Sequence, residues 1–118
     1  MTNASFEHNI LNDNSVVIHT GKQLDNNNAH EMVEKIVSIQ LEEYKFIIID
    51  MQELEFISSA GVGSILGTIE TSREMGGDII ISNASDPILQ VLEVLDLAEY
   101  LTISSDETKT AELCGSKG

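Results

Sequence analysis

The sequence predicts an α/β fold in which helices pack on a mixed sheet, and three observations predict it. The segments 45–50 and 78–82 do not alternate but contain consecutive apolar residues, 46–49 and 79–81, which is typical of strands covered on both faces. Stretches with apolar residues every three or four positions lie between such runs and predict amphipathic helices. After an initial pair of strands, the two signals alternate. The resulting order, ββαβαβαβα, requires crossover connections between parallel strands.

The first elements are two short strands, over residues 5–11 and 15–20. The turn residues Asn12-Asp13-Asn14 join them, which predicts an antiparallel hairpin. Gly21 ends the second strand, and residues 25–28 (Asp-Asn-Asn-Asn) offer several N-caps for a helix. The apolar residues of that helix recur at helical spacing: Ala29, Met32, Val33, Ile36, Val37 and Leu41.

A second helix is predicted after Ser58 and Ser59, and Gly76-Gly77 ends it before strand 78–82. Its apolar residues are Val62, Ile65, Leu66, Ile69 and Met75. Pro87 suits the first position of a third helix, whose apolar residues are Ile88, Leu89, Val91, Leu92 and Leu95. Residues 100–103 predict a short last strand. Ser104 with Glu107 fits a capping box for a C-terminal helix.

The length of 118 residues predicts one domain, over residues 1–114, followed by a loose tail at 115–118. The single cysteine, Cys114, excludes an internal disulfide framework. The first residues carry neither a basic nor an apolar segment, and no apolar run approaches the roughly 20 residues that span a bilayer. We therefore expect a cytoplasmic protein without a membrane anchor.

The chain is strongly acidic. Six Lys and Arg residues against 20 Asp and Glu residues give a net charge of −14. Nucleic-acid binding is disfavoured, because it requires Lys and Arg to replace phosphate counterions, and an anionic membrane surface is disfavoured for the same reason. Two interpretations of the charge stay open: solubility or a salty habitat, and electrostatic steering toward a basic partner.

The two serines Ser58 and Ser59 follow a strand and an acidic loop and stand at the start of a helix, where unpaired N–H groups favour an anion. Such a serine can cap the helix, attack a substrate or accept a phosphoryl group. A hydrolase elbow needs Gly-x-Ser-x-Gly, but Ile57 stands at the first glycine position. A nucleophile also needs a base, and all three histidines lie within the first 30 residues. The sequence therefore predicts no enzyme.

The glycines of the second helix resemble a dinucleotide fingerprint only superficially. After Gly61 and Gly63 the third glycine, Gly67, comes one residue late, and no basic residue lies nearby. Small residues instead form a stripe along this helix that admits another backbone, either the protein's own sheet or a partner: Ala60, Gly63, Ser64, Gly67 and Thr71. No His or Cys cluster has metal-ligand spacing, so neither a metal nor a cofactor is expected.

Taken together, these residues resemble the STAS domain family and, within it, the bacterial anti-sigma factor antagonists. A first signature runs from Gly21 through Leu24-Asp25 to Ala29. A second and more specific one comprises Ile49-Asp50-Met51, Leu54, Phe56-Ile57-Ser58-Ser59-Ala60-Gly61-Val62-Gly63 and Ile65-Leu66-Gly67. Gly76-Gly77 and the helix at Pro87 also fall where the family has them. The resemblance implies a single STAS domain, with a mixed sheet of about five strands and helices mainly on one face.

The resemblance also implies a non-catalytic regulator of transcription. The unphosphorylated protein would bind an anti-sigma factor that is also a serine kinase and would thereby free the sigma factor. The kinase would use ATP and Mg²⁺ to phosphorylate the antagonist, and a Ser/Thr phosphatase would reverse the modification. The family's acceptor is the serine that follows a position often occupied by aspartate, and it maps onto Ser59. Here that preceding position is Ser58, which supplies a second hydroxyl and is therefore the fallback acceptor.

The implied partner-binding surface comprises Asp25, Asn26, Asn27, Ser58, Ser59, Gly61, Gly63 and Gly67. A monomer or weak dimer is expected. An alternative stays open: a STAS module that acts as a scaffold or as an accessory subunit of a transporter, without phosphorylation.

Overall fold

The computed structural model describes residues 6–104 of the chain. The predicted C-terminal helix after Ser104, the cysteine at position 114 and the tail 115–118 lie outside the described residues, as do residues 1–5. The domain boundary at residue 114 therefore stays a prediction. None of the described helices is long and apolar enough to cross a bilayer.

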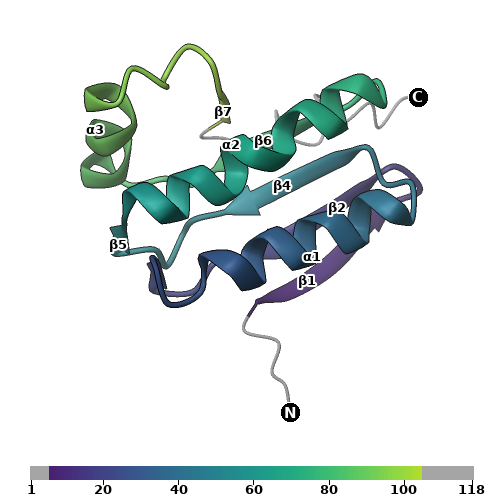
Figure 1. The fold of residues 1–118 in the computed structure, drawn as a ribbon, viewed down its shortest axis with the longest axis horizontal. Helices are drawn as coiled ribbons and strands as arrows, with labels where there is room; N and C mark the ends of the chain where they lie inside the picture. Colours follow the sequence, from purple (N-terminus) through teal and green to yellow (C-terminus); the bar gives the residue numbers. More distant parts are fainter. Residues whose placement is uncertain (1–5, 105–118) are drawn as a thin grey trace.

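The main sheet has five strands in the order β1-β2-β4-β6-β7 (Figure 1). Their bounds are β1 (Glu7–Asn12), β2 (Ser15–His19), β4 (Phe46–Asp50), β6 (Asp78–Ser82) and β7 (Thr102–Ser104). Strands β1 and β2 form the predicted antiparallel hairpin, and the remaining neighbours pair in parallel. The prediction of a mixed five-stranded sheet is confirmed.

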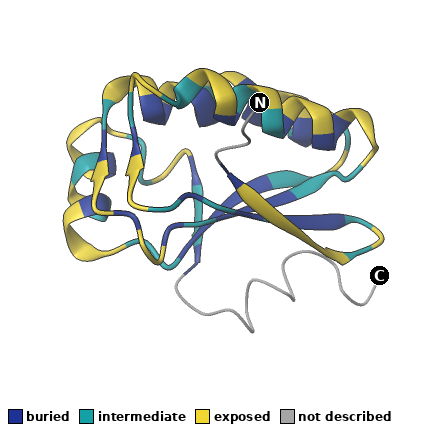
Figure 2. Ribbon diagram, turned by 90° about the horizontal axis from the view of Figure 1, so that it is seen from below, coloured by how far each residue is buried: buried dark blue, intermediate teal, exposed yellow. Residues whose placement is uncertain are grey.

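Two helices cover one face of this sheet. Helix α1 (Ala29–Leu41) and helix α2 (Ser59–Glu74) lie side by side over it, with buried residues toward the strands and exposed residues outward (Figures 1 and 2). Helix α3 (Asp86–Val94) lies at one end of the molecule. Pro87 stands in its first turn, as predicted.

The core confirms that the central strands are covered on both faces. Ile47 and Ile49 of β4 pair in register with Ile79 and Ile81 of β6, and all four are fully buried beneath the helices. On the opposite face Ile48 is also buried, together with its register partner on β6. Because odd- and even-numbered residues of β4 face opposite sides of the sheet and both sets are buried, the strand does not alternate between apolar and polar side chains.

The buried face of α1 differs from the predicted one. Val37 and Leu41 are exposed, whereas Ile39 and Gln40 are buried. Gln40 reaches α2, where its Nε2 donates to the Thr68 carbonyl at 2.9 Å and to a second acceptor on α2, the Ser72 hydroxyl, at 3.0 Å. A polar residue is tolerated there because its amide is hydrogen-bonded, and hydrophobicity alone does not indicate such a position.

Two further strands were absent from the predicted order. Strand β3 (Gln23–Leu24) and strand β5 (Phe56–Ile57) pair in parallel and form a separate two-stranded sheet. They lie within segments that the sequence assigns to loops, because a two-residue strand is too short to show a period. This small sheet brings residues 25–28 beside the start of α2.

Candidate functional site

The small β3–β5 sheet brings together two predicted parts of the site. The chain leaves β3 into the loop 25–28 and leaves β5 directly into Ser58. The Ser58 N–H donates to the Leu24 carbonyl at 3.0 Å, and the Ser58 hydroxyl donates to Asn26 Oδ1 at 3.2 Å. Asn28 closes the loop, since its Nδ2 donates to the Gln23 carbonyl. The predicted surface around residues 25–27 and the serines is therefore contiguous.

The two serines divide the roles that the sequence left open. Ser58 is the N-cap of α2, in extended conformation, and its Oγ accepts a hydrogen bond from the Gly61 N–H at 3.2 Å. Ser59 is the first residue of the helix, and its side chain is exposed. Within residues 6–104 its hydroxyl makes no hydrogen bond. The structural hydroxyl is that of Ser58, and the hydroxyl open to a partner is that of Ser59.

This division predicts unequal effects on stability. Ser58→Ala removes the cap and is expected to lower the free energy of unfolding by about 1 kcal/mol. Ser59→Ala removes an exposed hydroxyl and should change it by less than about 0.5 kcal/mol. Urea denaturation of the two variants and the wild type measures the difference. Equal losses in both variants would contradict the assignment of the cap to Ser58.

The close backbone approach occurs at Gly61 and not along the predicted stripe. A Cβ built on Gly61 would lie 2.2 Å from the Leu24 carbonyl oxygen. A Cβ on Gly63 or Gly67 would meet nothing within 4 Å, and both glycines are exposed. Packing against the protein's own sheet therefore does not require glycine at positions 63 and 67. Of the small residues in the predicted stripe, Ser64 alone is buried. The outer face of α2, where Gly63 and Gly67 leave no side chains, is therefore exposed.

An open groove of about 570 Å³ begins at the serines. Ile57, Ser58 and Ser59 line one side. Residues of α3 and its C-cap line the other: Pro87, Gln90, Val91, Val94 and Leu95. The sequence predicts α3 as an apolar helix but does not indicate that part of it forms this wall. A signal was present, because positions 87, 91 and 94 follow helical spacing on a different stripe from the buried Ile88 and Leu92.

A comparison with models of protein families shows which family the chain belongs to. The model of the STAS domain matches residues 7–110. The chain belongs to the STAS domain family. This STAS domain is 22% identical over 94 residues to the anti-sigma-B factor antagonist of Bacillus subtilis, a match that covers 80% of the chain and 85% of that protein.

Solved structures share the fold. The anti-sigma factor antagonist SpoIIAA in its unphosphorylated form superposes with a TM-score of 0.79 at 23% identity, over 93% of this chain and 96% of that one. The phosphorylated form of Bacillus SpoIIAA gives 0.71 at 24% identity, over 91% and 97%. The murine anion transporter Slc26a9 gives 0.71 at 12% identity over 87% of this chain, but only 18% of the transporter is covered.

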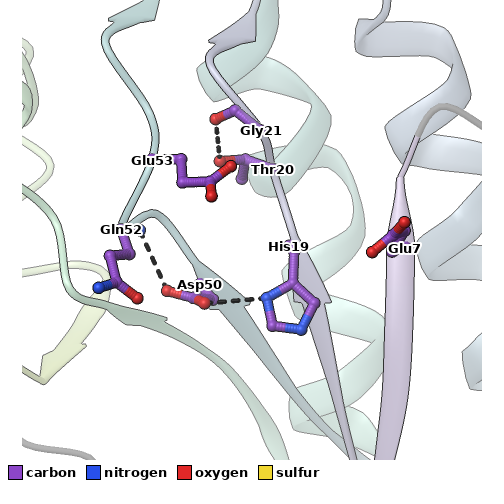
Figure 3. Close-up of a pocket in the computed structure, with 7 residues that line it drawn as sticks. All are labelled: Glu7, His19, Thr20, Gly21, Asp50, Gln52 and Glu53. Carbon is purple, nitrogen blue, oxygen red and sulfur yellow. Dashed lines mark hydrogen bonds and ion pairs between the residues drawn. The ribbon is translucent and has the colours of Figure 1, made fainter.

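A second cavity of this STAS domain, of about 280 Å³, lies at the carboxyl ends of β2 and β4 (Figure 3). His19 and Asp50 point toward each other across it, and His19 Nδ1 donates to Asp50 Oδ2 at 2.9 Å. The Nδ2 of Asn83 and the N–H of Gln52 each donate to Asp50 Oδ1 at 3.0 Å. Asp50 lines this cavity and not the groove at the serines. Within residues 6–104 no three His, Cys, Asp or Glu side chains are arranged to hold a metal ion.

These contacts set the protonation of Asp50. Burial alone would raise the pKa of its carboxyl, but the hydrogen bonds from Asn83, Gln52 and His19 outweigh burial and hold that pKa below its usual value of 3.8. A carboxyl with a lowered folded-state pKa contributes stability above the pKa of the unfolded chain. This contribution disappears as the pH falls through the folded-state pKa.

We therefore expect acid to destabilise this STAS domain partly through Asp50. The free energy of unfolding should fall as the pH drops below about 4, and it should fall less steeply in Asp50→Asn, which has no carboxyl to protonate. Urea denaturation at pH values from about 5 to about 2 measures both slopes. Identical slopes in the variant and the wild type would show that Asp50 does not contribute.

Proposed function

We propose that this STAS domain is an anti-sigma factor antagonist that acts in the cytoplasm and is not itself an enzyme. Its unphosphorylated form binds an anti-sigma factor serine kinase and frees the sigma factor. Phosphorylation of Ser59 ends this binding, and a Ser/Thr phosphatase restores it. Membership of the family and the names of the similar proteins support the proposal.

The environment of Ser59 is the observation that carries the proposal. Its side chain is exposed at the first position of α2, and the cap is already supplied by Ser58. A phosphoserine adds about −1.5 to −2 charges. The N–H groups at a helix start favour an anion, and the first turn of α2 contains no acidic side chain that would repel one. Modification at this position is therefore compatible with the folded state.

The same position explains how a phosphate would control binding. Ser59 follows Ser58, whose hydroxyl contacts Asn26 of the loop 25–27, and the exposed Gly63 and Gly67 lie further along the same helix. A partner that packs closely on this face would meet the added bulk and charge at its centre. Gly61 is buried, so its part in this surface is to let Leu24 approach α2 and thereby hold the loop.

The test is phosphorylation of the purified chain. The protein is incubated with each anti-sigma factor kinase of the source genome, ATP and Mg²⁺, and its intact mass is measured. A shift of one phosphate is expected in the wild type and in Ser58→Ala and not in Ser59→Ala. A shift that Ser58→Ala alone abolishes would move the acceptor to Ser58.

A second function, that of an unphosphorylated scaffold or transporter accessory subunit, has one observation in its favour. A part of the murine anion transporter Slc26a9, 18% of its chain, shares this fold with a TM-score of 0.71. This function predicts no mass shift with any kinase of the source genome, so the same experiment separates the two.

A further inference from the structure

The groove beside the serines exposes apolar surface that the fold does not use. Val94 is 82% exposed and Leu95 is 41% exposed, and both line the groove with Val91. The opposite wall is formed by Ile57 and the two serines. We call this feature the β5–α3 groove. Its floor and walls are mostly apolar, which favours an apolar side chain as occupant.

The α3 side of the groove carries one sign of charge. No Lys or Arg occurs in residues 74–104, and Asp86, Glu93 and Asp96 of α3 and its C-terminal turn are exposed. The whole chain has a net charge of −14. A second copy of this chain would bring acidic residues against acidic residues, so the charges disfavour it. They favour a segment in which Lys or Arg residues flank the apolar side chain.

We propose that the β5–α3 groove binds an apolar side chain of the partner kinase, from a segment flanked by Lys or Arg. The inference rests on the proposed function and adds a second contact to it, separate from the loop 25–27. Ser59 lines the groove, so a phosphate there would be forced out of water against the bound apolar side chain. Burial of a charge without a partner is strongly unfavourable, which explains how one phosphate would release both contacts.

The test compares two matched variants. Val94→Asn and Leu41→Asn each replace an exposed apolar residue at the last position of a helix, and neither changes the charge. Binding to the purified kinase is measured by calorimetry without ATP. We expect Val94→Asn to weaken binding by roughly tenfold or more, and Leu41→Asn to leave it unchanged. Urea denaturation checks that both variants are folded.

A third variant tests the charge. Glu93→Lys lies on the acidic rim and should weaken binding and reduce its dependence on salt. A complex that Val94→Asn leaves unchanged would overturn the inference while the proposed function stands. A wild-type chain that is dimeric, with Val94→Asn monomeric, would assign the groove to a second copy and overturn it too. No complex and no mass shift with any kinase would overturn the proposed function and this inference together.

Discussion

Gly61→Ala is expected to destabilise the domain by about 3 kcal/mol or more. The new Cβ would lie 2.2 Å from the Leu24 carbonyl oxygen and 2.9 Å from its carbonyl carbon. Both are backbone atoms that the β3–β5 pairing holds in place, and the Leu24 side chain is fully buried. Neither side can move without breaking the contact between the loop 25–28 and α2. Urea denaturation measures the loss.

Gly63→Ala is the matched control, since it makes the same chemical change two residues later in the same helix. Its Cβ meets nothing within 4 Å, and alanine is favoured over glycine inside a helix by up to about 1 kcal/mol. We expect this variant to be more stable than the wild type. If Gly61→Ala also gained stability, the close approach between α2 and Leu24 would be wrong.

The sequence predicts most of the fold because the long elements have a clear period. Runs of consecutive apolar residues, 46–49 and 79–81, identify β4 and β6, and the turn residues between β1 and β2 identify the hairpin. Helix α2 was placed within a residue because its start is signalled by Ser58 and its end by Gly76-Gly77, of which Gly76 adopts a positive φ of 91°. In each case the signal is local.

The parts of the site that sequence reasoning missed depend on contacts between distant segments. The β3–β5 pair joins residues that lie more than thirty positions apart, and neither strand has a pattern of its own. The tight position in α2 is Gly61 and not Gly63 or Gly67, because only Gly61 faces Leu24. The groove exists because α3 lies beside β5, and the exposure of Val94 follows from that placement.

Ser59→Asp is expected to separate function from stability. A negative charge at the first position of α2 interacts favourably with the helix dipole, so the free energy of unfolding should rise by about 0.3 to 1 kcal/mol. Binding of the kinase should nevertheless weaken by roughly tenfold or more, because the charge lies at the centre of the proposed surface. Calorimetric titration with the kinase and urea denaturation measure the two quantities on the same preparation.

Ser58→Asp is the control that keeps the charge and moves it by one residue. Aspartate is as good an N-cap as serine, and it can accept the Gly61 N–H as the Ser58 hydroxyl does. The variant should therefore remain folded. Ser58 also lines the groove and contacts Asn26, but its side chain is half-buried whereas that of Ser59 is exposed, so the charge at position 58 should weaken binding less than the charge at position 59. If Ser58→Asp and Ser59→Asp weakened kinase binding equally, a negative charge at either position would be enough to disrupt the complex. The result would then not single out Ser59 as the regulatory position. If Ser59→Asp unfolded the domain, Ser59 would be a structural residue, and the proposed phosphorylation would have to act at another position.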